Sequence, residues 1–289
     1  MIYVNGQFLS PIDAKIETTD RGFLLSDGIF ETIPIYQGKP FALEKHWVRL
    51  KKSADLLELP IEFSYENLET TVEALCKLNA IKGSKAALRL TITRGSGPRG
   101  LNYPDNIKPT IMMAVFPSPD HTIHPLNLGI STIRRNEYSP LANIKSLAYL
   151  DNILARREMV KRGFNDAILL NTQGNVASSS AANVFIVTKD NGLITPHIKD
   201  GVLPGITREI VLALATHHHI PIEERSIHPD ELFTAKEMFI TNSIIEIQAV
   251  KQIHDKIFDC HENLITRTLQ TAYKTFIIEC SEQAIQAFS

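Results

Sequence analysis

The stretch VFIVTKDNGLIT, residues 184–195, places two short apolar runs on either side of the tripeptide Asp190-Asn191-Gly192. Apolar, β-branched runs that flank an Asn-Gly pair are typical of a β-hairpin, because both residues tolerate the left-handed backbone of a tight turn. We therefore expect strands at 184–187 and 193–195. Strands joined by tight turns rather than by helices favour an α+β fold with antiparallel or mixed sheets over a doubly wound parallel sheet.

Similar patterns extend through the rest of the chain. Ile2-Tyr3-Val4 followed by Asn5-Gly6 begins like another hairpin. Apolar residues at helical spacing predict a helix over 43–58, and Ser64 is a suitable N-cap for the next helix. The remaining expected strands are 87–92, 110–116, 128–134, 167–170 and 238–241, and the remaining expected helices are 147–161, 206–218 and 262–279.

Prolines punctuate residues 117–125, at Pro117, Pro119 and Pro125. Proline restricts the backbone and lacks an N–H donor, so this segment resists both a helix and a central strand. We expect it to link a smaller N-terminal α/β domain over residues 1–116 to a larger C-terminal domain over residues 126–289.

The composition argues against several classes of protein. The 289 residues carry a formal net charge of -2 and are 44% hydrophobic, which gives no general attraction to nucleic acid or acidic membranes. No uncharged apolar run reaches the ~18 residues of a spanning helix, and the first residues do not resemble a signal peptide. The 3 cysteines lack metal-site spacing and are odd in number, so we expect a reducing, cytoplasmic location.

Two polar segments have features of a phosphate site. Leu203-Pro204-Gly205-Ile206-Thr207-Arg208 precedes an apolar helical run, so the amides of Ile206 and Thr207 would lie at the positive end of a helix dipole. Thr241-Asn242-Ser243 directly follows a predicted strand and offers hydroxyl and amide groups. Taken alone, each segment is more simply an ordinary helix start or a turn.

Lys145 lies in Asn143-Ile144-Lys145-Ser146-Leu147, between the Pro140 loop and a predicted helix. Its apolar neighbours favour partial burial, which favours the neutral amine that forms imines. From this local pattern alone, a solvated lysine near a helix start is the simpler interpretation. No metal is expected, because the adjacent histidines of His217-His218-His219 do not share a helix face.

In combination, these features resemble the fold type IV enzymes that use pyridoxal 5'-phosphate (PLP), the class IV aminotransferases. This family includes D-amino-acid transaminases, branched-chain aminotransferases and aminodeoxychorismate lyases. The motifs that carry the resemblance stand in the family order: Asp20-Arg21-Gly22-Phe23, Ser26-Asp27-Gly28-Ile29-Phe30-Glu31, His46-Trp47-Val48-Arg49-Leu50, Thr93-Arg94-Gly95-Ser96-Gly97-Pro98-Arg99-Gly100, Ile144-Lys145-Ser146-Leu147, Ala182-Asn183-Val184-Phe185 and Pro204-Gly205-Ile206-Thr207-Arg208. The resemblance implies two α/β domains with PLP held at their junction, in a homodimer whose partner chain helps to close the pocket.

The resemblance also assigns roles to matching residues of this chain. Lys145 would form the Schiff base with PLP and transfer protons, and Arg49 would pair with the cofactor phosphate. Asp166 would help to orient groups near the lysine. The remaining phosphate contacts are assigned to the amides of Ile206 and Thr207 and to a side chain of Asn242 or Ser243.

One cofactor-binding position departs from the family pattern. The family usually has a glutamate that pairs with the pyridine nitrogen of PLP, and Ser178 stands in its place. A carboxylate keeps that nitrogen protonated and makes PLP a strong electron sink, whereas a hydroxyl only hydrogen-bonds. Transamination relies heavily on the sink, and an elimination that aromatises its product relies on it less. Ser178 is therefore a modest argument for a lyase, with a shifted alignment or a degenerate site as the alternatives.

The substrate-binding positions point the same way. D-amino-acid transaminases hold the substrate carboxylate with a tyrosine, an arginine and a histidine, where this chain has Phe30, Arg99 and Leu101. Aminodeoxychorismate lyases also have phenylalanine at the position of Phe30 and a similar glycine-rich loop around Arg99. Arg99 would bind a carboxylate through two parallel hydrogen bonds, although an exposed hairpin arginine is the simpler alternative.

We therefore expect a lyase that converts 4-amino-4-deoxychorismate to 4-aminobenzoate and pyruvate, a step toward folate. Two alternatives stay open. The first is an amino-acid transaminase of the D-amino-acid or branched-chain type. The second is a PLP-binding protein without turnover.

Overall fold

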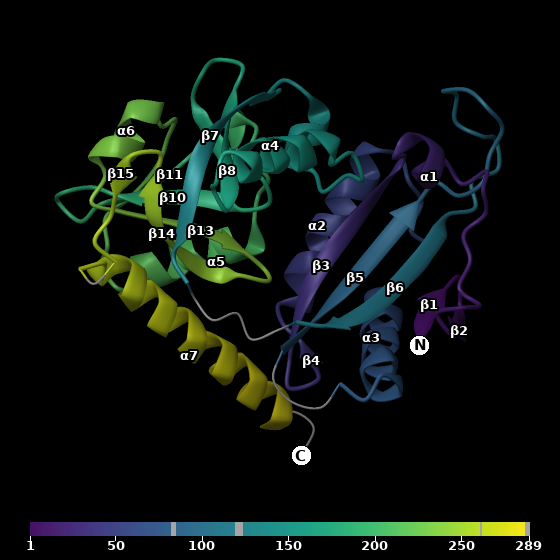
Figure 1. Cartoon of the computed structure of the whole chain (residues 1–289). Coiled ribbons are helices and arrows are strands. Elements are labelled where there is room, and N and C mark those ends of the chain that lie inside the picture. The colour runs from purple at the N-terminus through teal and green to yellow at the C-terminus, as the bar shows by residue number, and fades with distance from the viewer. Residues whose placement is uncertain (82–84, 119–123, 261, 287–289) are drawn as a thin grey trace. The chain divides into compact units, whose positions relative to one another are not determined.

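A computed structural model of the chain describes residues 1–81, 85–118, 124–260 and 262–286, with side chains up to residue 280 (Figure 1). The chain divides into two units. Unit 1 comprises Met1–Asp120, Ile144–Ala148 and Cys280–Ser289, and unit 2 comprises His121–Asn143 and Tyr149–Glu279. We expected a contiguous division on either side of residues 117–125. Two segments depart from it. The backbone of Ile144–Ala148 pairs with the sheet of unit 1, and the C-terminal residues from Cys280 also belong to unit 1.

Unit 1 contains an antiparallel sheet of six strands in the order β2-β1-β6-β5-β3-β4. The N-terminal hairpin is confirmed, and its turn places Asn5 at φ 45° and Gly6 at φ 90°, as a tight hairpin turn requires. The strands are β1 (Ile2–Val4), β2 (Gln7–Leu9), β3 (Gly28–Tyr36), β4 (Lys39–Pro40), β5 (Lys85–Thr93) and β6 (Thr110–Pro117).

The helices of unit 1 are α1 (Arg21–Leu25), α2 (Leu43–Leu56) and α3 (Tyr65–Leu78). Ser64 caps α3 as predicted, in a reciprocal capping box with Asn67. Helix α2 ends two residues before the predicted end at residue 58, because Glu58 takes a left-handed φ of 49°. Apolar side chains of α2 and α3 pack with alternate residues of β3 and β5 into one core. This core therefore covers one face of the sheet.

Unit 2 contains a mixed sheet of nine strands, ordered β12-β11-β10-β13-β14-β7-β8-β9 with β15 beside β14. The predicted hairpin is confirmed as β10 and β11, and the pairs β7–β8, β7–β14 and β11–β12 are parallel. The strands are β7 (Leu126–Arg135), β8 (Asp166–Asn171), β9 (Val176–Ser179), β10 (Asn183–Val187), β11 (Leu193–Thr195), β12 (Ile222–Glu224), β13 (Glu237–Asn242), β14 (Glu246–Ile253) and β15 (Lys256–Ile257).

The helices of unit 2 and the chain's last helix are α4 (Leu150–Lys161), α5 (Ile206–His217), α6 (Pro229–Thr234) and α7 (Leu264–Gln286). The prediction that a helix begins at residue 147 is wrong: Ser146 pairs with Ile29 of β3, the Leu147 amide donates to the Gly28 carbonyl, and α4 begins at Leu150. Helix α7 continues past the predicted end at 279. Within the described residues, every helix is too short or too polar to cross a membrane.

Candidate active site

Lys145 is held on unit 1 by a short backbone ladder. The Phe30 amide donates to the Lys145 carbonyl at 2.9 Å, and the Leu147 amide donates to the Gly28 carbonyl at 3.0 Å. A Cβ on Gly28 would lie 2.5 Å from the Ile92 carbonyl oxygen and 2.9 Å from Leu147 Cδ1, so only glycine lets the three segments approach. Lys145 stands opposite Phe30, and both side chains therefore extend from the same face of the sheet.

The Phe30 ring contacts two cations. Lys145 Nζ lies 4.2 Å from the ring centroid and Arg89 Cζ lies 3.3 Å from it. Phe30 is buried and Lys145 is half-buried. Our sequence predictions missed Arg89, although a charged residue between Leu88 and Leu90 was a usable sign that one strand face carries polar groups. These contacts place the Lys145 amine beside an aromatic surface and a second positive charge.

Arg49 forms a bidentate ion pair with Glu31. Arg49 Nε donates to Glu31 Oε1 at 2.8 Å and Arg49 Nη2 donates to Glu31 Oε2 at 2.7 Å. Burial raises the pKa of Glu31, but the charge and hydrogen bonds of Arg49 outweigh burial and lower that pKa to about 2. Arg49, which we predicted to contact a phosphate, thus has a partner that we did not predict: Glu31, whose carboxylate orients the guanidinium.

His46 completes this buried group. Its Nδ1 lies 2.8 Å from Glu31 Oε2, and burial, the largest influence, lowers the pKa of the ring. Because ionised Glu31 can only accept, Nδ1 carries the proton and Nε2 keeps a lone pair. Nε2 is buried and has no hydrogen-bond partner among the described residues. Glu31 and His46 were visible in the sequence only as members of two family motifs.

In unit 2, the start of α5 has the form of an anion cradle. Gly205 is the N-cap of this helix, and a Cβ there would lie 2.0 Å from Asn183 Oδ1. The first amides of a helix have no acceptor within it, and here they belong to Ile206 and Thr207, both buried. Thr241 Oγ1, on the strand that pairs with Asn183, is buried and without a hydrogen-bond partner in the described part of the chain. These donors fit a phosphate group such as that of PLP.

Asn242 and Ser243 differ in what their side chains already do. Asn242 Nδ2 donates to the Ala181 carbonyl at 3.0 Å, and Asn242 Oδ1 accepts from the amides of Ile244 and Ile245 at 2.8 and 2.9 Å. The Asn242 amide therefore holds its own loop together. The Ser243 hydroxyl makes no hydrogen bond to the described residues.

Ser178 and Asp166 lie on neighbouring strands of unit 2. Ser178 is buried in β9 and stands opposite Leu169 of β8, and Asp166 is the first residue of β8. The Asp166 carboxylate accepts the Ala167 amide at 2.8 Å. The pyridine-nitrogen contact of Ser178 and the orienting role of Asp166 stay predictions, since these contacts show only where the two side chains lie.

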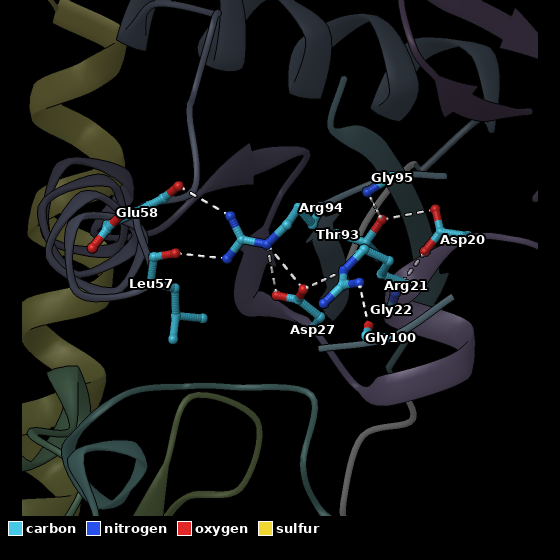
Figure 2. A network of polar contacts seen from close by, with 10 residues as sticks. All are labelled: Asp20, Arg21, Gly22, Asp27, Leu57, Glu58, Thr93, Arg94, Gly95 and Gly100. Atoms are coloured by element: carbon cyan, nitrogen blue, oxygen red, sulfur yellow. Dashed lines mark hydrogen bonds and ion pairs between the residues drawn. The ribbon is translucent and has the colours of Figure 1, made fainter. Parts of the chain in front are cut away.

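Arg99 lies on the loop between β5 and β6 and is exposed. Its guanidinium has no hydrogen-bond or ion-pair partner among the described residues. The loop around it, by contrast, is tightly bonded to α1 and its flanking residues, as Figure 2 shows for Arg21, Asp27 and Arg94.

Comparisons with known proteins find relatives along nearly the whole chain. A family model described as amino-transferase class IV matches residues 28–253. An aminodeoxychorismate lyase of Bacillus subtilis is 32% identical over 275 residues, which cover 95% of this chain and 94% of that protein. A D-alanine aminotransferase of Staphylococcus epidermidis is 30% identical over 278 residues, which cover 96% and 97%. The crystal structure of a branched-chain aminotransferase from Thermoproteus uzoniensis, with norvaline, is similar with a TM-score of 0.91 and 26% identity, covering 98% of this chain and 96% of that one.

Proposed function

We propose that this chain, which belongs to the class IV aminotransferase family and uses PLP as its cofactor, is a 4-amino-4-deoxychorismate lyase. The products would be 4-aminobenzoate and pyruvate. The family membership makes it a PLP-dependent enzyme, and the choice of reaction is the proposal.

The surroundings of the Lys145 amine carry this proposal. Lys145 Nζ lies 4.2 Å from the centroid of the Phe30 ring, which has no hydroxyl to offer a substrate carboxylate. The tyrosine that the resemblance assigns to D-amino-acid transaminases therefore has no counterpart here. The apolar Phe30 ring beside the amine suits packing against the unsaturated six-membered ring of the proposed substrate. Because Phe30 cannot bind a carboxylate, we assign that contact to Arg99.

PLP, when bound, withdraws electrons from the carbon that bears the substrate's amino group. Lys145 would remove the proton from that carbon, and the bond to the enolpyruvyl oxygen would break as the ring becomes aromatic. Lys145 would then return a proton to the departing enolpyruvate, which gives pyruvate. No oxidant or second substrate is needed for this sequence.

Two sets of residues are proposed to hold PLP. Arg49, oriented by Glu31, and the amides of Ile206 and Thr207 would bind its phosphate, with Ser243 as the added side chain. Ser178 would donate its hydroxyl to the pyridine nitrogen. A hydroxyl leaves that nitrogen largely neutral, which agrees better with elimination than with transamination.

The alternative is an amino-acid transaminase of the D-amino-acid or branched-chain type. Its support is the 30% identity to the staphylococcal D-alanine aminotransferase over nearly the full length of both proteins. This identity is close to that of the lyase relative, so the overall similarity does not separate the two reactions.

Product analysis separates them. With 4-amino-4-deoxychorismate we expect 4-aminobenzoate and pyruvate in equal amounts, and with D-alanine and 2-oxoglutarate we expect no glutamate. Lys145→Ala should abolish turnover and the visible absorption that borohydride removes, because it deletes the only proposed imine-forming amine. Lys161→Ala, at the exposed end of α4, is the matched control and should behave as wild type. Glutamate formation without release of 4-aminobenzoate would select the transaminase instead.

We further propose that the enzyme is a cytoplasmic homodimer. No disulfide joins Cys76, Cys260 and Cys280, which agrees with a reducing compartment. Phe23 of α1 is 75% exposed and Leu150 of α4 is 66% exposed, each beside further exposed apolar residues. Apolar groups of this size on two helices are typical of protein interfaces. Sedimentation equilibrium would test the assembly.

A further inference from the structure

We propose that Arg21 is a positioning residue for Arg99, and that it acts through the backbone of the glycine-rich loop. The inference rests on the proposed function, in which Arg99 binds the substrate carboxylate. Arg21 is itself buried, so its effect on substrate is indirect.

Arg21 holds the loop at two places. Its backbone amide donates to the Gly95 carbonyl at 2.8 Å, and its Nη1 donates to the Gly100 carbonyl at 2.9 Å. Arg99 immediately precedes Gly100, so the second bond fixes the chain one residue after Arg99. A Cβ on Gly97 would lie 3.2 Å from Arg21 Cδ, so the loop also packs against the arginine's aliphatic chain.

Asp27 orients Arg21 and connects it to the lysine segment. Arg21 Nε donates to Asp27 Oδ2 at 2.8 Å, and Arg94 Nε donates to the same oxygen at 2.9 Å (Figure 2). The next residue after Asp27 is Gly28, whose carbonyl receives the Leu147 amide. One carboxylate thus ties the loop that carries Arg99 to the strand that holds Lys145.

Arg94 fixes the other side of this arrangement. Its Nη1 and Nη2 donate to the carbonyls of Glu58 and Leu57 at 3.1 and 2.6 Å, beyond the end of α2. The Tyr103 ring covers its guanidinium at 3.7 Å. The loop is therefore anchored at Gly95, Gly100 and Tyr103, while the Arg99 side chain between them extends into solvent.

This geometry predicts a specific kinetic effect. Without Arg21 the Gly100 carbonyl loses its hydrogen bond. The backbone beside Arg99 is then less fixed, and so is the position of the Arg99 guanidinium. A bidentate contact with a carboxylate depends strongly on such alignment. Substrate affinity should fall, while the proton transfers at Lys145, on the other side of Asp27, should be little changed.

The test compares Arg21→Met, Arg99→Met and the double variant as PLP-loaded enzymes, with whichever substrate is turned over. We expect Arg99→Met to raise KM by about 10- to 100-fold, as the loss of a charged hydrogen-bonded contact implies. Arg21→Met should raise KM about tenfold, with kcat within about twofold of wild type. Arg21→Lys, which retains one donor and the charge, should recover part of the loss. The double variant should have the KM of Arg99→Met alone.

An independent measurement is hydrogen exchange of the loop. Amides of residues 96–103 should exchange faster in Arg21→Met than in wild type or in Arg99→Met. Arg225→Met is the matched control, because Arg225 also binds a carboxylate (Glu231) and a backbone carbonyl (Ser226), but far along the chain in unit 2. Its KM and loop exchange should not change.

The outcomes separate this inference from the function on which it rests. If Arg99→Met raises KM but Arg21→Met does not, or if their effects multiply, Arg21 does not act through Arg99 and the inference is overturned. If Arg99→Met leaves KM unchanged, Arg99 is not the carboxylate ligand, and that part of the proposed function fails together with the inference.

Discussion

Two arginine–carboxylate groups in unit 1 use the same chemistry differently. In the first, Glu31 binds Arg49 and His46, all within the interior between β3 and α2. In the second, Asp27 binds Arg21 and Arg94, and these two arginines also donate to the backbone carbonyls of three further residues, Leu57, Glu58 and Gly100.

The difference lies in what the cations reach beyond the carboxylate. The first group leaves the buried Nε2 of His46 without a hydrogen-bond partner among the described residues. In the second group the two Nε atoms donate to Asp27, whereas Arg21 Nη1 and both Nη atoms of Arg94 donate to backbone carbonyls. This group therefore holds separate segments of the chain together. The two groups therefore differ in their partners: Arg49 pairs with a side-chain carboxylate, whereas Arg21 and Arg94 also hold backbone carbonyls.

The largest effect should follow from Glu31→Gln. The substitution leaves the Arg49 charge buried without its bidentate partner, which costs about 3–5 kcal/mol. We expect this loss in the free energy of unfolding of the cofactor-free protein, measured by urea denaturation, together with weaker PLP binding. A variant as stable as wild type would show that Arg49 finds an equivalent partner. The Glu31 group would then be no more important for stability than the Asp27 group.

Asp27→Asn should have a smaller effect, about 2–3 kcal/mol, because Arg21 and Arg94 keep their carbonyl acceptors and the amide still accepts one hydrogen bond. PLP binding should be retained and KM should rise. Urea denaturation, a PLP titration and steady-state kinetics would check these three statements. Loss of PLP binding comparable to that of Glu31→Gln would place Asp27 with the cofactor group instead.

The smallest effect should be a pH dependence that belongs to the first group alone. The pKa of His46 is lowered in the folded chain, so the unfolded chain binds the proton more readily. Its contribution to stability is therefore complete above about pH 6.5 and is lost as pH falls below that value, by at most about 1.4 kcal/mol per pH unit.

His46→Asn retains a donor for Glu31 and removes this titration. Urea denaturation of wild type and variant between about pH 7.5 and 5.5 should show the steeper acid loss in wild type only. Asp27→Asn should keep the wild-type slope, since its group contains no histidine. Equal slopes in wild type and His46→Asn would assign the acid dependence to other histidines.

Local chemistry explains which elements were predictable. The hairpins around Asn5-Gly6 and Asn191-Gly192 and the Ser64 cap depend on residues close in sequence, and they were predicted where they occur. Strand β9 was missed, because Val176-Ala177-Ser178-Ser179 has no periodic pattern and lies buried beside the neighbouring strands β8 and β10. The start of α4 was misplaced because the backbone of Lys145 and Leu147 bonds to Phe30 and Gly28, which are distant in sequence.

The sequence by itself determined the family, the cofactor and the candidate residues Lys145, Arg49 and Arg99, because these are carried by ordered motifs that can be read one residue after another. Only the tertiary structure decided who their neighbours are: Arg89 on the Phe30 ring, Glu31 on Arg49, and Arg21 at Gly100. Such pairs join residues that are 18 to 79 positions apart, as Arg49–Glu31 and Arg21–Gly100 show. Side-chain contacts at that separation are set by strand register and packing, which no local pattern encodes.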